Sequence, residues 1–187
     1  MLVRPGGVLF LDLSRTVGWA YGADPEAEPL WGVWRLPAGF ELGRVFASYE
    51  NELLRAFEEY GPAKVGMEAP LPASQQTDAF TAELQIGLAA ITECACYRWD
   101  KPLMRRSSQT IRSAVIGRAH RTDAERQARI DVKKAIVEPW VAARGWRITD
   151  HNSRDAAVGL AYELGVRHVR QGRRQRADDA PQAGRAA

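Results

Sequence analysis

Two short apolar segments of this chain each end in a carboxylate, and this feature constrains the fold more than any other. Asp12 closes the run VLFLD, and Glu68 closes the run KVGME. Buried strands rarely carry acids, because an unpaired charge held away from water is costly. A third acidic segment, DHNSRDAA, contributes Asp155 from the start of an expected helix. Acids from two strand ends and one helix indicate a shared cation, and their hard oxygen ligands suit Mg²⁺ or Mn²⁺.

The hydrophobic patterns predict an α/β fold. The run that ends at Asp12 is apolar on both faces, which is typical of a central strand. Two further strands follow, and the short connection between them at residues 23–29, with its prolines, makes the three strands an antiparallel meander. A helical crossover then places the strand that ends at Glu68 parallel to the first. We expect strands at residues 8–13, 18–22, 30–36, 64–68 and 103–105, and helices at 41–59, 79–98, 109 onward, 130–144 and 152–166.

This order of elements predicts a mixed five-stranded sheet flanked by helices, in one domain over residues 1–168. Residues 117–129 are polar and basic, so we expect a mobile loop there, and residues 169–187 are expected to form a basic, disordered tail. No apolar run of about 18 residues exists, so no membrane span is expected. No convincing secretory signal is present, and Cys94 and Cys96 are expected to be buried and reduced, which favours a cytoplasmic location.

Asp12 and Glu68 are expected to meet at one edge of the sheet. Parallel neighbouring strands present their carboxyl ends at the same edge, where ligand sites of α/β sheets lie. Two divalent ions about 4 Å apart can activate a water and stabilise the leaving oxygen of phosphodiester cleavage. With Asp12 bridging two ions, Glu68 holding one and Asp155 the other, the pattern predicts a metal-dependent nuclease.

The fourth group of this site is open among Asp150, His151 and Asn152. Asn152 and His151 lie three and four residues before Asp155, on the same helical face. Asp150 lies off that face, but it can reach the site if the helix begins after it. Asp150 could instead cap the helix, and His151 could be a ligand, a general acid–base group or a surface histidine.

Basic side chains near these acids indicate a nucleic-acid partner. The net charge of +3 is modest. Arginine outnumbers lysine, and its planar guanidinium suits bidentate phosphate contacts, although solvated surface is the alternative. The candidate DNA-binding residues are Arg105, Arg106, Arg112, Arg118, Arg121, Lys133 and Lys134.

Four segments, taken in order, resemble the motifs of RuvC-like Holliday junction resolvases, in particular those of phages and prophages. The resemblance extends over roughly residues 8–165, through LDLSRTVGWA at 11–20, VGMEAP at 65–70, the stretch at 110–133 and DHNSRDA at 150–156. It implies an RNase H-like fold, a homodimer and two-metal-ion cleavage of four-way DNA junctions. It also implies that Asp12, Glu68 and Asp155 are the metal carboxylates. Many family members carry an acid or a histidine where this chain has Asn152.

The resemblance further implies that the loop after Glu68 lies near the centre of the junction. In this chain the loop region contains Gln75, Gln76 and Phe80. Phe80 could stack on an unpaired base or belong to the core.

A dimer also follows from the expected substrate, because a four-way junction has two-fold symmetry and needs two symmetric nicks. Another RNase H-like nuclease, acting on branched DNA or RNA–DNA hybrids, is an alternative, as is a non-catalytic nucleic-acid-binding protein of the same fold. A sugar-kinase or actin-like ATPase needs a second, glycine-rich nucleotide lobe. A chain of 187 residues without such a repeat disfavours it.

Overall fold

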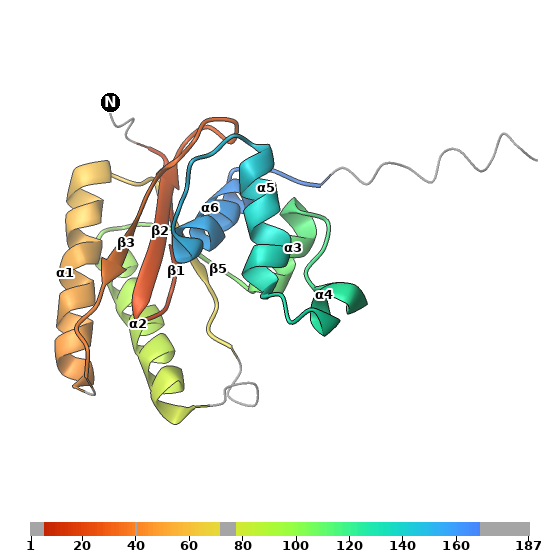
Figure 1. Cartoon of the computed structure of the whole chain (residues 1–187). Helices are drawn as coiled ribbons and strands as arrows, with labels where there is room; N and C mark the ends of the chain where they lie inside the picture. The colour runs from red at the N-terminus through yellow and green to blue at the C-terminus, as the bar shows by residue number, and fades with distance from the viewer. Residues whose placement is uncertain (1–5, 40, 72–77, 169–187) are drawn as a thin grey trace, which may run out of the picture.

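The computed structural model describes residues 6–39, 41–71 and 78–168 (Figure 1). The strands are β1 (Val8–Asp12), β2 (Thr16–Gly22), β3 (Leu30–Arg35), β4 (Lys64–Glu68) and β5 (Leu103–Arg106). The helices are α1 (Leu42–Tyr60), α2 (Ala79–Arg98), α3 (Ser108–Val115), α4 (Asp123–Gln127), the π-helical turn η2 (Lys133–Val137), α5 (Glu138–Ala143) and α6 (His151–Glu163). The tail predicted at residues 169–187 lies outside the described residues.

The strands form one five-stranded mixed sheet in the order β3-β2-β1-β4-β5. β1 and β3 both pair antiparallel with β2, which confirms the predicted meander. β4 lies parallel to both β1 and β5, as the helical crossovers predicted. The carboxyl ends of β1 and β4 therefore meet at one edge of the sheet.

Helices cover both faces of the sheet, and the pleat of β1 divides its side chains between them. Figure 1 shows α1 and α2 on one face, with α6, α5 and α3 on the other. Leu9 and Leu11 are buried in the core under α1 and α2. Val8 and Phe10 are buried in the core under α6. A strand that is buried on both sides explains the continuous apolar run before Asp12.

α6 lies directly against the sheet because glycines remove the side chains that would hold it away. A Cβ on Gly159 would come within 2.1 Å of the Phe10 ring. A Cβ on Gly18 of β2 would come within 2.2 Å of the backbone carbonyl group of Asn152. These close approaches place the first turn of α6 over β2, near the edge where β1 ends.

The structure corrects several predicted elements. The loop expected at residues 117–129 contains α4, which begins with a capping box at Thr122. The helix expected at 130–144 begins at Val132 and contains a π turn before α5. Pro139 has no N–H to offer the Ala135 carbonyl group, which accepts a hydrogen bond from Arg118 instead. The last helix ends at residue 163, before the predicted 166.

The two cysteines differ in exposure. Cys94 is exposed, contrary to expectation, whereas Cys96 is buried. In the described part of the chain, every helix is too short or too polar to cross a membrane.

Candidate active site

The pleat of the sheet turns Asp12 and Glu68 toward the same helix. Successive side chains of a strand point to opposite faces. Asp12 therefore lies on the same side as Phe10, which packs under α6. In β4, Val65 and Met67 belong to the opposite core, so Glu68 also lies on the α6 side. Both acids stand at the carboxyl edge of the sheet, as the sequence predicted.

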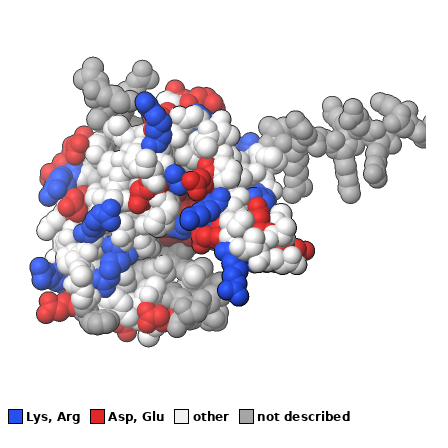
Figure 2. Space-filling model, viewed as in Figure 1, with Lys and Arg blue, Asp and Glu red and all other residues white. Residues whose placement is uncertain are grey.

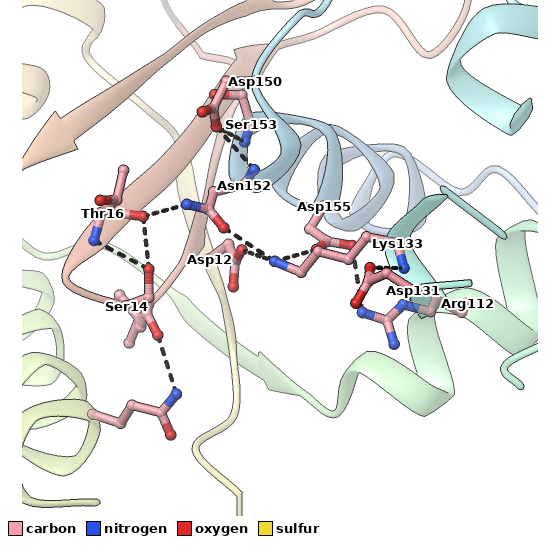
Figure 3. A network of polar contacts seen from close by, with 12 residues as sticks. Asp12, Ser14, Thr16, Arg112, Asp131, Lys133, Asp150, Asn152, Ser153 and Asp155 are labelled. Carbon is pink, nitrogen blue, oxygen red and sulfur yellow. Dashed lines mark hydrogen bonds and ion pairs between the residues drawn. The ribbon is translucent and has the colours of Figure 1, made fainter. Parts of the chain in front are cut away.

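The first turn of α6 is held in place by its capping residue and a serine. Asp150 is the N-cap, and its Oδ1 accepts hydrogen bonds from the backbone N–H groups of Asn152 (2.8 Å) and Ser153 (3.0 Å). The Ser153 hydroxyl donates to the Gly32 carbonyl oxygen of β3 at 2.8 Å. Asn152 and Asp155, one helical turn apart, then point toward the end of β1 (Figure 3).

The side chain of Lys133 joins three of these groups. Its Nζ lies 2.7 Å from Asp155 Oδ2, 3.0 Å from Asn152 Oδ1 and 3.4 Å from Asp12 Oδ2. Figure 3 shows the ammonium group between the three oxygens. From the sequence, Lys133 was a candidate for DNA contact, with solvated surface as the alternative. The structure places it among the candidate metal ligands themselves.

Asn152 is oriented by a second hydrogen bond. Its Nδ2 donates to the Thr16 carbonyl oxygen at 2.9 Å, so its Oδ1 faces Lys133. Asp150 is occupied by the helix cap, and His151 is exposed. Of the three candidates for the fourth group, the structure therefore favours Asn152.

Two residues of α3 support the carboxylates. The Arg112 Nη2 atom lies 3.4 Å from Asp155 Oδ1, which leaves the other carboxylate oxygen to Lys133. The Ser108 side chain hydrogen-bonds to Glu68. Ser108 was not among the site residues predicted from the sequence. The available signal was its place in the first turn of a helix that directly follows a strand parallel to β4.

Burial and mutual repulsion raise the pKa of both strand-end acids. The pKa of Asp12 rises to about 6, mainly through burial, with Lys133 opposing the rise and Asp155 adding to it. The pKa of Glu68 rises to about 7, through burial first and then the Asp12 charge, although Ser108 acts in the opposite direction. Burial lowers the pKa of Lys133, but the two aspartates outweigh it, so that pKa is raised. Burial is therefore the main reason why both acids hold their protons more tightly than they would in water.

The donor chemistry of the cluster suits a hard divalent cation. Among the described residues, no three side chains of the His, Cys, Asp or Glu type converge as a ready ligand cage. Three oxygens do converge on one positive charge, the Lys133 ammonium. Carboxylate and amide oxygens are ligands that Mg²⁺ and Mn²⁺ accept, so these residues fit the expected metal.

The predicted DNA-binding arginines each contact another group of this chain. Figure 2 shows acidic and basic side chains intermixed on the face that it presents. Four of the predicted arginines bind groups of this chain: Arg105 binds Glu93, Arg106 lies near Glu163, Arg118 binds Glu125, and Arg121 binds the Ile130 carbonyl oxygen. The fifth, Arg112, supports the carboxylate of Asp155.

A hollow of about 380 Å³ lies beside the acidic cluster, and it contains other predicted residues. It is lined by Lys133, Lys134, His151, Arg154, Asp131, Glu138 and Val137. Lys134 and His151 are exposed there. Phe80 is half-buried, with the Arg15 guanidinium group 5.1 Å from its ring centroid. Gln75 and Gln76 lie outside the described residues.

No protein-family model and no curated protein matches the sequence. Among solved structures, Thermus thermophilus RuvC in complex with a Holliday junction substrate has a TM-score of 0.62 at 14% identity, over 85% of this chain and 93% of that chain. The chain has the fold of RuvC. A second structure of T. thermophilus RuvC has a TM-score of 0.61 at 13% identity, over 84% and 93% of the two chains.

The yeast mitochondrial Holliday junction resolvase Ydc2 is also similar, with a TM-score of 0.56 at 12% identity, over 87% of this chain and 80% of that chain. The predicted RNase H-like sheet with helices on both faces is therefore confirmed. At these identities the RuvC comparison establishes the fold. The roles of individual residues stay predictions.

Proposed function

We propose that this protein is a structure-selective DNA endonuclease that resolves four-way or branched DNA junctions. The observation that carries the proposal is that Asp12 and Glu68 lie on the α6 side of the RuvC-like sheet, where β1 and β4 end, close enough to Asp155 for the three charges to act on one another. Acids whose pKa values are raised by burial first and by neighbouring carboxylates second contribute little to stability, and they are common at functional sites.

The residues divide the work of phosphodiester hydrolysis between them. The Asp12 carboxylate interacts electrostatically with both Glu68 and Asp155, so it could hold one metal ion together with Glu68 and another together with Asp155. Two Mg²⁺ or Mn²⁺ ions bound there would activate the attacking water and stabilise the leaving oxygen. Ser108 orients Glu68, and Arg112 orients Asp155.

The hollow beside the cluster supports a DNA partner. Lys134 and His151 line it, next to the first turn of α6, where they can contact phosphates that flank the cut site. Arg105, Arg106, Arg112, Arg118 and Arg121 stay further candidates for contacts with the DNA.

We propose a homodimer, with α2 as its contact surface. Leu84, Leu88 and Ala95 of α2 face the core. Ile86 and Tyr97, on other sides of the same helix, are 56% and 89% exposed. A two-fold dimer through this helix would present one site per subunit to a symmetric four-way junction and produce two paired nicks.

Mg²⁺-dependent cleavage of a synthetic four-way junction tests the proposal. We expect paired, symmetric nicks in the junction and much slower cutting of a linear duplex and of an RNA–DNA hybrid. Asp12→Asn is the control that removes the central ligand while keeping the side-chain shape. Equal cutting of all three substrates would replace the proposal with a general RNase H-like nuclease. Binding without any metal-dependent cutting would indicate a non-catalytic DNA-binding protein.

A further inference from the structure

The Lys133 ammonium is surrounded by three oxygens that belong to two different elements, and Lys133 belongs to a third. Asp12 comes from β1, Asn152 and Asp155 come from α6, and Lys133 itself comes from η2. We propose that this ammonium takes the place of a divalent cation in the metal-free protein and is displaced when the metal binds. The inference rests on the proposed function only in requiring a metal site at this cluster.

The three oxygens are directed at this one position by contacts that do not involve Lys133. Asn152 Oδ1 faces it because Nδ2 of the same amide is bound to the Thr16 carbonyl oxygen. Asp155 Oδ2 faces it, while Oδ1 of that carboxylate lies against Arg112. Asp12 reaches it through the pleat of β1. The cage is therefore built by the fold, and the lysine fills it.

Lys133 is also the member of the cluster that is free to leave. Its side chain is 32% exposed, compared with 11% for Asp12 and 5% for Asp155. The same side chain lines the neighbouring hollow, which also contains the carboxylates of Asp131, an acceptor for the Lys133 backbone N–H, and Glu138, which pairs with Arg154. Withdrawal into the hollow would break no core packing and would leave the three oxygens where they are.

The consequence is that a divalent cation binds only above the concentration at which it displaces the Lys133 ammonium. An ammonium holds Asp12 and Asp155 together with one charge, and a divalent cation with two charges replaces it when its concentration suffices. The cage then stays assembled without metal, and metal binding is weaker than the bare cage would allow.

Substitution of Lys133 by methionine tests this competition, with the exposed neighbour Lys134→Met as the matched control. Electron paramagnetic resonance of free Mn²⁺ measures binding to the full chain. We expect Lys133→Met to bind Mn²⁺ at least about tenfold more tightly than wild type, and Lys134→Met to change the affinity by about twofold at most. In EDTA, Lys133→Met should melt roughly 5–10 °C lower, and saturating Mn²⁺ should close that gap.

Acylation of lysines in the wild-type protein, followed by mass spectrometry, gives a measurement that does not depend on the variant's folding. Mn²⁺ should speed the modification of Lys133. Lys64, which lies 2.8 Å from the Glu163 carboxylate, serves as an internal reference that should not change.

Three results would overturn the inference: equal or weaker Mn²⁺ binding by Lys133→Met than by Lys134→Met, no Mn²⁺ binding by any of the proteins, or acylation of Lys133 that metal leaves unchanged. The junction assay separates this outcome from the proposed function. Wild-type protein that cuts junctions while Lys133→Met binds Mn²⁺ normally contradicts the displacement alone. If Lys133→Met binds Mn²⁺ more tightly and the wild-type protein does not cut junctions, the result contradicts the nuclease alone.

Discussion

Replacing Glu68 with glutamine is expected to stabilise the metal-free protein while it removes nuclease activity. The pKa of Glu68 is raised from 4.5 to about 7, chiefly by burial and then by the Asp12 charge. The folded protein thus binds this proton more tightly than the unfolded chain, and its stability falls as pH rises from about 4.5 to 7. Above pH 7 the ionised side chain costs about 3 kcal/mol at most, and about 2 kcal/mol when screening by solvent is allowed for.

Thermal denaturation in EDTA, at pH 5 and at pH 8, measures this cost. Glutamine is neutral at both values, so Glu68→Gln should melt about 4–8 °C above wild type at pH 8 and close to wild type at pH 5. Glu58→Gln is the control, because that side chain is exposed on α1 and should leave the melting temperature unchanged at both pH values.

The reasoning fails if Glu68→Gln is no more stable than wild type at pH 8, or if it gains the same amount at pH 5. The first result would mean that the ionised carboxylate is not strained in the metal-free fold. The second would mean that packing or hydrogen bonding, rather than charge, explains the gain. Loss of junction cutting in the same variant connects the destabilised carboxylate to function.

Three further substitutions test the site, the seating of α6 and the dimer. Asp12→Asn should slow junction cutting by about a thousandfold or more, because a bound metal supplies several kcal/mol of transition-state stabilisation. Binding of the junction, measured by gel shift, should persist. Undiminished cutting would exclude Asp12 as a ligand. Gly18→Ala should lower the free energy of unfolding by about 1–3 kcal/mol in urea titrations, because its Cβ meets the first turn of α6. Gly43→Ala, in open space within α1, should be neutral or stabilising, and equal effects at the two positions would contradict the close approach. Ile86→Glu should convert a dimer to a monomer in sedimentation velocity, whereas Ile130→Glu, at another exposed isoleucine, should not; a dimer that survives Ile86→Glu does not use this face of α2.

Much of the fold could be predicted because its signals are local. β4 and α2 have the bounds that the sequence predicted, since one is a short apolar run and the other lies between a polar loop and a strand. α1 ends before Gly61, whose φ of 54° is a left-handed conformation that glycine adopts without strain. The π turn before α5 was missed, because the local pattern shows Pro139 but not the long-range contact of Arg118 that accommodates it.

The arginines were harder to place than the acids. An acid at the end of a buried strand must lie at the edge of the sheet, because the end of the strand fixes its position. A long arginine side chain on a surface can reach several partners, and the packing of distant elements decides which one it binds. Arg105 and Arg118 bind acids of α2 and α4, and their spacing in the sequence did not indicate these partners; their contact with DNA stays a prediction.

The sequence by itself determined which acids lie at strand ends and that β1 and β4 run parallel, because a strand's apolar run and a helical crossover are encoded locally. The tertiary structure decided that Asp12 and Glu68 face α6, that Asn152 contacts the cluster while Asp150 caps the helix, and that Lys133 lies among the oxygens. These outcomes depend on which elements meet across the sheet. The contact between Asp12 and Lys133, far apart in the chain, is set by the packing of η2 against α6 and of α6 against β1, and no periodicity within either segment records it.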